Sequence, residues 1–297
     1  MAMIISCGEA LVDLVPAPVP GGGPMNVAVT CARLGAPTAF VGRVSTDSHG
    51  EAIWEHLVTS GVDVRLTQRG PEPTCRAEVF GDPPVFRFHG EHTADVFVEP
   101  PDPDLLIGGP HLLHGGTLSI FREPGAGVLA ELAESLDGIV SFDPNVRPQI
   151  IEPLGRDRWQ PWFNRWCAVA SLFRASDDDL AWIWPDRDEG DIAAELLARG
   201  IVALITTRSV DVTVHTAEGH ITVPVPPVDV VDTVGAGDSF CGGVLTQLWE
   251  RHIHTIGALA TVTLSEWREI VAFAISVAGI TVRRRGADPP FVGDLST

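Results

Sequence analysis

The most informative stretch of the sequence reads Val231-Asp232-Thr233-Val234-Gly235-Ala236-Gly237-Asp238-Ser239-Phe240. A helical pattern follows it, because apolar residues recur every three or four positions from Phe240 to Leu248. The glycines at 235 and 237 allow successive N–H groups to point into one concavity, and a helix N-terminus adds partial positive charge. The stretch therefore predicts an anion site built from backbone.

Asp238 falls in the first turn of the predicted helix, beside any anion bound there. A carboxylate at this position is either a helix cap, which stabilises the helix by about 1 kcal/mol, or a general base beside a phosphate. The four residues 235–238 alone do not decide between these two roles.

A second glycine-rich loop, Gly21-Gly22-Gly23, precedes Pro24 and opens another predicted helix. It is either a flexible turn before a proline in the first helical turn, or a backbone that approaches a ligand closely, with Asp13 and Asn26 as partners for neutral hydroxyls. A dinucleotide fold requires G-x-G-x-x-G after the first strand. The third glycine is replaced by Asn26 here and by Phe240 in the later loop, which disfavours a nicotinamide-dependent dehydrogenase.

Strand-like runs alternate with helical patterns along the chain, which predicts an α/β fold with a mainly parallel sheet and helices on both faces. Thr263 and Glu266 form a capping-box pattern before the last helix. We expect strands at 3–7, 38–42, 112–114, 139–142, 172–174 and 202–206, and helices at 24–34, 48–60, 128–136, 192–199, 238–251 and 265–281.

Residues 74–80 and 85–89 break this alternation, because they pair an apolar–polar pattern with a turn at 81–84. This hairpin is either a lid over the site or an ordinary surface hairpin. The proline-rich segment 15–20 leaves little room for an extra lid strand. We expect a single domain over 1–297, with a small lid contributed by about 13–22 and 74–98.

The composition excludes several classes of function. The 297 residues carry a net charge of -19, with 20 arginines and no lysine, so binding to nucleic acid or to an anionic membrane surface is disfavoured. The absence of lysine also excludes Schiff-base chemistry and the phosphate loop that ends in Lys-Ser/Thr. Five widely spread cysteines and an N-terminus without a basic region predict a cytoplasmic protein with buried thiols.

The two glycine-rich loops resemble the two signatures of the PfkB/ribokinase family of carbohydrate kinases, most closely its fructokinase branch. Gly22-Gly23-Pro24-Met25-Asn26 matches the first signature, and residues 232–240 match the second. The likeness continues through Asp143-Pro144-Asn145-Val146-Arg147-Pro148 and the segment 281–290. The resemblance implies a ribokinase-like fold with a small β lid.

The resemblance also implies an ATP-dependent kinase in which Asp238 takes the proton from a sugar hydroxyl. The amides of Gly235, Ala236 and Gly237 hold the developing negative charge, while Arg147 and Mg²⁺ neutralise phosphate. The family's sugar-binding positions correspond to Asp13, Gly22, Gly23, Asn26, Phe88, Asn145 and Asp238.

On the nucleotide side, the resemblance implies that ATP binds at Ser176, Thr207, Ser209, Gly235, Gly237, Phe273 and Ser276. Asp179 takes the place of a family glutamate that acts indirectly on Mg²⁺, although Ser176 and Asp179 also form an ordinary helix cap. Asp232 matches a loop that binds a monovalent cation such as K⁺. The turn 207–212 lacks two glycines of the family pattern, which puts the ATP contacts there in doubt.

The substrate implied first is fructose, converted to fructose 6-phosphate. Phe88-x-Gly90 offers no fixed cation, which disfavours an acidic sugar such as 2-keto-3-deoxygluconate. Kinases of ribose or of nucleosides are alternatives, as is a non-catalytic protein that binds a sugar or a nucleotide. A second copy of the chain is an expected partner, whereas nucleic acid and membrane are not.

Overall fold

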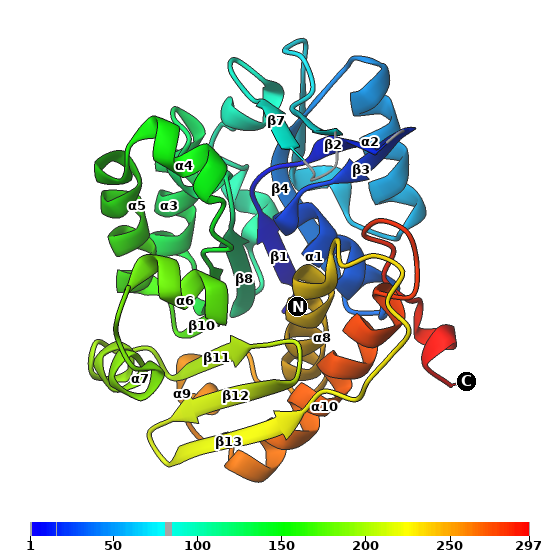
Figure 1. Cartoon of the computed structure of the whole chain (residues 1–297). Helices are drawn as coiled ribbons and strands as arrows, with labels where there is room; N and C mark the ends of the chain where they lie inside the picture. Colours follow the sequence, from blue (N-terminus) through cyan, green and yellow to red (C-terminus); the bar gives the residue numbers. More distant parts are fainter. Residues whose placement is uncertain (1, 16, 81–84, 297) are drawn as a thin grey trace.

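A nine-stranded sheet forms the centre of the molecule, in the order β13-β12-β11-β10-β9-β8-β1-β4-β5 (Figure 1). The computed structural model describes residues 2–15, 17–80 and 85–296. Neighbouring strands from β11 to β5 run parallel, and β12 and β13 are antiparallel, which confirms the mainly parallel sheet. The strands are β1 (Ile4–Cys7), β4 (Thr38–Ser45), β5 (Thr67–Gly70), β8 (His111–Gly116), β9 (Gly138–Asp143), β10 (Leu172–Ser176), β11 (Ala203–Thr207), β12 (Asp211–Thr216) and β13 (Gly219–Pro224).

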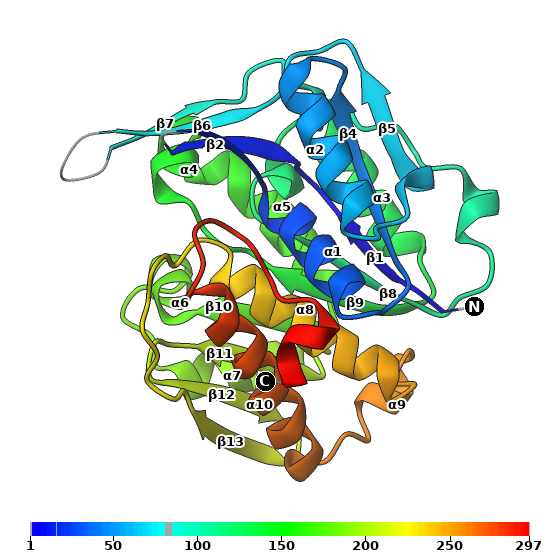
Figure 2. The ribbon, with the colours of Figure 1, turned by 90° about the vertical axis from the view of Figure 1, so that its right-hand side faces the viewer.

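Helices cover both faces of this sheet, as the sequence predicts (Figure 2). Successive side chains of a strand point to opposite faces, so Ile4 packs in the core under α1, α8 and α10, whereas Ile5 packs in the core with α3, α5 and α7. The helices are α1 (Gly23–Arg33), α2 (Ser48–Thr59), α3 (Gly125–Ser135), α4 (Pro148–Leu154), α5 (Arg156–Val169), α6 (Asp177–Ile183), α7 (Glu189–Ala198), α8 (Ala236–Glu250), α9 (Ile256–Leu259) and α10 (Leu264–Thr281).

A second, smaller sheet lies at one end of the large one, in the order β3-β2-β6-β7. The predicted hairpin is present as β6 (Arg76–Phe80) and β7 (Val85–His89), which pair antiparallel. The predicted turn at 81–84 lies outside the described residues. Strand β2 (Leu11–Val15) pairs with β6 in parallel and with β3 (Ala17–Gly21) in antiparallel fashion.

The presence of β3 corrects the prediction that segment 15–20 leaves little room for an extra lid strand. Pro18 and Pro20 occupy alternate positions of an edge strand, so both imino nitrogens face the same side. The missing N–H groups therefore fall on the side away from β2. Alternating prolines are compatible with an edge strand, although they exclude a central one.

The six helices predicted from the sequence are all present, with ends that differ by three residues or fewer. The capping box before α10 is also confirmed, because Thr263 and Glu266 each accept a hydrogen bond from the other's backbone. The sequence predicts no helix for α5, which contains Pro161. Within the described residues, no helix combines the length and apolarity needed to cross a bilayer.

Candidate functional site

The turn before α8 has the conformation that an amide-lined anion site requires. Gly235 is the N-cap of α8 and has a φ of 76°, in the left-handed region that favours glycine. A Cβ at this position would lie 2.5 Å from Cβ of Ala287, so the turn also needs glycine for space. The N–H of Ala236 donates to the carbonyl of Thr233 over 3.2 Å, and that of Ser239 donates to the carbonyl of Gly235. Because the first N–H groups of a helix have no intrahelical acceptor, those of Gly237 and Asp238 stay available at the start of α8.

Asp238 meets Asn26 across a sequence separation of 212 residues. Nδ2 of Asn26 donates to Oδ2 of Asp238 over 2.8 Å, which joins the first turns of α1 and α8. Burial and the nearby charge of Asp143 raise the pKa of Asp238 to about 6, although the bond from Asn26 and the charges of Arg147 and Arg174 oppose this shift. A carboxylate with that pKa is suited to accept a proton near neutral pH.

Asp13 faces the same cluster from β2. Burial and the charge of Asp238 raise the pKa of Asp13 to about 6, so the two carboxylates influence each other. A Cβ at Gly21 would lie 2.4 Å from Oδ2 of Asp13, which explains why the last residue of β3 has no side chain. The two carboxylates predicted for the sugar site and the base are therefore neighbours.

Gly23 at the start of α1 lies against the ends of β8 and β9. A Cβ there would be 2.4 Å from Oγ1 of Thr117 and 3.3 Å from Nδ2 of Asn145. Asn145 donates to Oγ1 of Thr117 over 3.1 Å, and both residues have positive φ values, 60° for Thr117 and 39° for Asn145. Non-glycine residues in this conformation concentrate at functional sites. Thr117 was not predicted, because its position beside Gly23 depends on how β8 meets α1.

The second sheet contributes Phe88 on the face that carries Asp13. Asp13 pairs with Ala77, which in turn pairs with Phe88, so the three side chains share one row and one face. The guanidinium of Arg122 lies 5.1 Å from the centre of the Phe88 ring. The prediction that no fixed cation lies near Phe88-x-Gly90 is therefore wrong, because Arg122, distant in sequence, donates to the carbonyl of Gly90. Its charge is balanced by an ion pair with buried Asp95.

Two arginines lie near Asp238, and only one was predicted. Arg147 is exposed, and its guanidinium donates to the carbonyls of Asn145 and Val146. Arg174 is buried in β10, where its Nη1 lies 2.8 Å from Oδ2 of Asp143. A Cβ at Gly237 would lie within 3.1 Å of both terminal nitrogens of Arg174. A charged residue inside the apolar run 172–175 stands out in the sequence, but its place beside Gly237 follows only from the fold.

The predicted nucleotide positions lie at the ends of β10 and β11 and on α10. Ser176 and Asp179 form a capping box at the start of α6, in which Asp179 also accepts a bond from the N–H of Val146. Oγ1 of Thr207 accepts a hydrogen bond from Arg174, whereas Ser209 is exposed. Half-buried Phe273 and exposed Ser276 lie on α10, which packs against β12 and β13.

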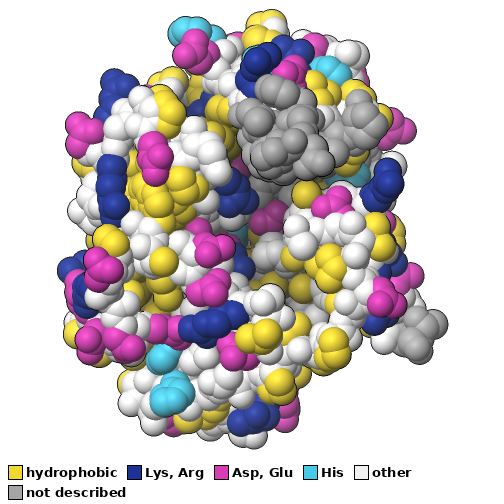
Figure 3. All heavy atoms as spheres, viewed as in Figure 1, with side chains coloured by type: hydrophobic (Ala, Val, Ile, Leu, Met, Phe, Trp, Pro, Cys, Tyr) yellow, Lys and Arg dark blue, Asp and Glu magenta, His cyan; other side chains and the backbone are white. Residues whose placement is uncertain are grey.

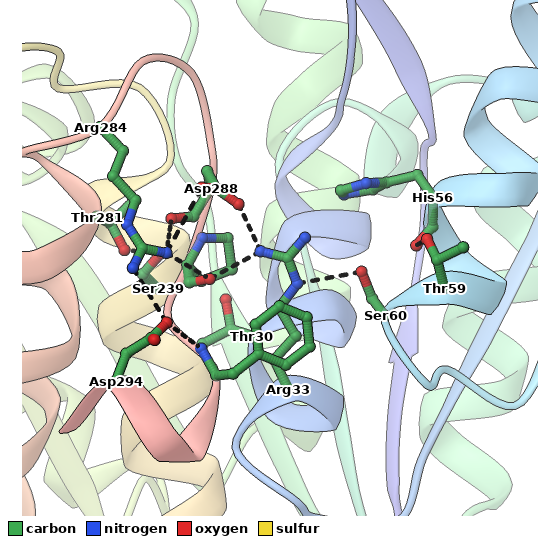
Figure 4. Close-up of polar contacts among 12 residues, drawn as sticks. Thr30, Arg33, His56, Thr59, Ser60, Ser239, Thr281, Arg284, Asp288 and Asp294 are labelled. Carbon is green, nitrogen blue, oxygen red and sulfur yellow. Dashed lines mark hydrogen bonds and ion pairs between the residues drawn. The ribbon is translucent and has the colours of Figure 1, made fainter. Parts of the chain in front are cut away.

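Asp232 links the turn before α8 to the C-terminal segment. Its Oδ2 accepts from the N–H of Gly286 over 2.9 Å, and its Oδ1 accepts from the N–H of Val234. Two residues later in that segment, Asp288 binds Arg33, the last residue of α1, over 2.6 Å (Figure 4). Through these contacts the segment that touches Gly235 is fixed to both α1 and α8.

The face of the molecule seen in Figure 3 has a depression. The space-filling view shows this face hollowed near its centre, with acidic and arginine side chains at the edge of the hollow (Figure 3). No group of three or more histidine, cysteine or carboxylate side chains that could hold a metal ion is present in residues 2–15, 17–80 and 85–296.

Comparison with known proteins identifies the family. The model of the pfkB family carbohydrate kinases matches residues 17–292. A fructokinase of Rhizobium leguminosarum bv. trifolii is 32% identical over 261 residues, which cover 83% of this chain and 79% of the relative.

Solved structures agree with this result. The ATP-bound fructokinase of Xylella fastidiosa is 26% identical with a TM-score of 0.89, and the match covers 99% of this chain and 97% of that one. A fructokinase of Vibrio cholerae O395 bound to fructose, ADP and a calcium ion is 25% identical, with a TM-score of 0.81 and coverage of 97% and 94%. The aminoimidazole riboside kinase of Salmonella enterica is 28% identical, with a TM-score of 0.84 and coverage of 99% and 98%.

These similarities agree with the observed fold, with the two glycine-rich loops at the starts of α1 and α8, and with the carboxylate of Asp238. The small-molecule substrates of such an enzyme are a sugar and ATP, and a divalent metal accompanies the nucleotide. The chain belongs to the pfkB family of carbohydrate kinases and is an ATP-dependent sugar kinase.

Proposed function

We propose that this enzyme transfers the γ-phosphate of ATP to fructose and produces fructose 6-phosphate. The observation that carries the reaction type is the hydrogen bond of Asn26 to Asp238 at the first turn of α8, directly after the amide turn 235–237. The fructokinase names of similar proteins support the choice of sugar.

Asp238 is the general base in this proposal. It accepts the proton of the C6 hydroxyl as that oxygen attacks the γ-phosphorus and the bond to the β–γ bridging oxygen breaks, with ADP as the leaving group. The N–H groups at residues 235–237 stabilise the negative charge that develops on the phosphoryl oxygens. Asn26 orients the carboxylate, since its amide holds one of the two oxygens.

The sugar hydroxyls meet neutral or anionic partners. Asp13, Asn26 and Asn145 supply acceptors and amide donors around Gly22 and Gly23, where a Cβ would collide with neighbouring protein atoms. The cation beside Phe88 is Arg122, which is already paired with Asp95. A neutral ketohexose therefore fits this side better than a sugar acid, whose carboxylate would need an unpaired cation.

The nucleotide is proposed to lie along Ser176, Thr207, Ser209, Phe273 and Ser276, with Mg²⁺ on its phosphates. Mg²⁺ in such sites keeps several waters and binds phosphate oxygens. Both oxygens of Asp179 already accept protein hydrogen bonds, so it would act on the metal through water. Asp232 is proposed to border a monovalent cation such as K⁺.

The enzyme is further proposed to work in the cytoplasm and to form a homodimer. All five cysteines are free and buried, which suits a reducing compartment. Light scattering of the purified protein tests the dimer, and a monomeric mass at micromolar concentration would contradict it.

A substrate panel tests the proposed function. Fructose, 2-keto-3-deoxygluconate, ribose and adenosine are each supplied with ATP and Mg²⁺, and ADP release is measured with the Asp238→Asn protein as background. We expect the highest kcat/KM for fructose, by at least about tenfold, because the other substrates leave polar groups of the site unpaired. A preference for ribose or adenosine would show that the proposed substrate is wrong, and no turnover of fructose would refute the proposed function.

A further inference from the structure

Arg174 is a charged residue within a buried strand of the central sheet. It lies in β10, with 8% of its surface exposed, between Phe173 and Ala175, which are fully buried. Burial lowers the pKa of an arginine, yet the carboxylates of Asp143 and Asp179 hold the pKa of Arg174 above its usual value. The side chain is therefore a permanent positive charge inside the protein.

The contacts of Arg174 join three neighbouring strands at their carboxyl ends. Its Nη1 lies 2.8 Å from Oδ2 of Asp143 at the end of β9, and its Nη2 donates to Oγ1 of Thr207 at the end of β11. These bonds use two of its five N–H donors, and its buried Nε has no hydrogen-bond partner within the described ranges. A buried ion pair is weak evidence of a stabilising role, since the loss of hydration offsets much of the attraction.

The guanidinium also lies directly beneath the proposed phosphate site. A Cβ on Gly237 would be 3.0 Å from Nη1 and 3.1 Å from Nη2, so the Cα of Gly237 rests on the charged group. Both the second glycine of the amide turn and the orientation of the turn depend on this contact. Arg147, by contrast, is exposed and is held by backbone carbonyls alone.

We propose that Arg174 is a positioning residue for phosphoryl transfer: it holds Gly237 in place and supplies the fixed positive charge beneath the amide turn. This inference rests on the proposed kinase function and assigns the charge neutralisation to a residue of β10 rather than to Arg147 alone. A fixed charge under N–H dipoles strengthens them where negative charge develops, and it requires no rearrangement during the reaction.

Three variants test the proposal: Arg174→Gln, Arg174→Lys and the double variant Asp143→Asn/Arg174→Gln. We expect Arg174→Gln to lower kcat about 10²-fold, the size of effect typical of a lost electrostatic group, with KM for the sugar little changed. Arg174→Lys keeps the charge and should recover at least about tenfold of that loss. The double variant leaves no unpaired charge, and we expect its kcat to stay within about threefold of Arg174→Gln.

The pH profile separates an electrostatic role from a purely structural one. Removing the cation alone raises the pKa of Asp238, so the acid limb of the kcat profile should move to higher pH in Arg174→Gln. Replacing Asp143 as well removes a negative charge that raises the pKa of Asp238, so the acid limb of the kcat profile should move back towards lower pH in the double variant. The titratable or charged groups that influence Asp238 are Asp13 on β2, Asp143 after β9, Arg147 before α4, Arg174 on β10 and Cys241 on α8.

Two results would overturn the inference: wild-type kcat in Arg174→Gln, or wild-type kcat in the double variant, which would show that Arg174 only neutralises Asp143. Arg165→Gln, which breaks an exposed pair with Glu134, is the matched control and should leave kcat unchanged. Circular dichroism and melting curves identify variants that fail to fold, and the double variant then carries the test.

The wild-type protein is assayed in parallel, so that a failure of the proposed function can be distinguished from a failure of the proposal for Arg174. If it turns over no sugar, the kinase proposal is wrong, and calorimetric titration with MgATP then decides the role of Arg174. If the double variant binds MgATP at least about tenfold more weakly than the wild type does, the result supports a role of the Arg174 charge in phosphate binding. Equal affinity refutes that role.

Discussion

At the scale of single residues, the chemistry depends on one carboxylate. Asp238 is held by Asn26 at the start of α8, and its pKa of about 6 lets it accept a proton at neutral pH. Asp238→Asn should therefore lower kcat by about 10²–10⁴-fold, with a smaller effect on the KM of either substrate. Steady-state kinetics of ADP release measures both parameters.

The matched control for this variant is Asp191→Asn, which removes another aspartate from the first turn of a helix, α7, on the exposed surface. The control should keep the wild-type kcat. A near-normal kcat in Asp238→Asn would instead show that Asp238 acts as a helix cap and not as the base.

The pH dependence of the reaction should report the same carboxylate. Asp238 is active when ionised, so kcat/KM should fall about tenfold for each pH unit below about 6. The charge of Asp238 raises the pKa of Asp13, and because repulsion between two carboxylates is mutual, the charge of Asp13 should also raise the pKa of Asp238. Asp13→Asn should thus shift the acid limb to lower pH, even though it also weakens sugar binding; an unmoved limb would show that the two groups are not coupled.

Individual residues also show which parts of the site could not be predicted from the sequence. Asp238, Asn26 and Asp13 were identified because short motifs carry them, and the structure brings the three together. Thr117 and Arg174 were missed, since each belongs to the site only through the pairing of strands distant in sequence. A motif records which residues are adjacent along the chain, whereas these contacts arise across the sheet.

At the scale of elements, the start of α1 positions the sugar side. A Cβ at Gly23 would lie 2.4 Å from Oγ1 of Thr117, within a turn that has little room to adjust. Gly23→Ala should therefore lower kcat/KM for the sugar by at least about tenfold. Gly257→Ala on α9 is the matched control, because its Cβ would meet no atom within 4 Å. Equal kinetics in the two variants would contradict the tight contact.

The C-terminal segment is held to α1 by Arg33, whose side chain is 9% exposed and bonds Asp288 and the carbonyl of Pro289. Arg33→Met should destabilise the protein by about 1–3 kcal/mol, because it breaks a partly buried network. It should also lower kcat, since the same segment packs Ala287 against Gly235.

Thermal melting and steady-state kinetics measure these two effects. Arg251→Met removes a more exposed pair with Glu269 and should change stability by less than about 1 kcal/mol, with kcat unaffected. If Arg33→Met were destabilised to the same small extent as this control, the C-terminal contact would not support the turn before α8.

Helices and strands whose apolar residues recur with a clear period were predicted well, and the other elements were not. The helices that alternate with parallel strands were found within a few residues of their ends, because burial of one face imposes a period on their sequence. Strand β3 was not expected, because the proline-rich segment 15–20 was predicted to leave little room for it, yet an edge strand tolerates prolines on one side. Helix α5 contains Pro161 and was left unassigned.

At the scale of the whole molecule, the net charge of -19 opposes the approach of ATP. The cations of the site act over short distances, whereas the acidic surface repels the nucleotide over the Debye length of about 10 Å at 0.1 M salt. Raising tetramethylammonium chloride from about 0.02 to 0.2 M at constant K⁺ should therefore increase the association rate of MgATP. Stopped-flow fluorescence measures this rate, and a decrease with salt would show that local attraction dominates.

The contacts around the reaction centre also determine when during synthesis it can form. Residues 22–26 emerge early from the ribosome, the turn 235–238 follows more than 200 residues later, and Gly286 and Asp288 follow after that. A nascent chain can pair its first parallel strands, yet it cannot join Asn26 to Asp238 or fix the turn through the C-terminal segment. The contacts that fix the reaction centre can therefore form only after residues 286–288 have been synthesised, however early its first loop emerges.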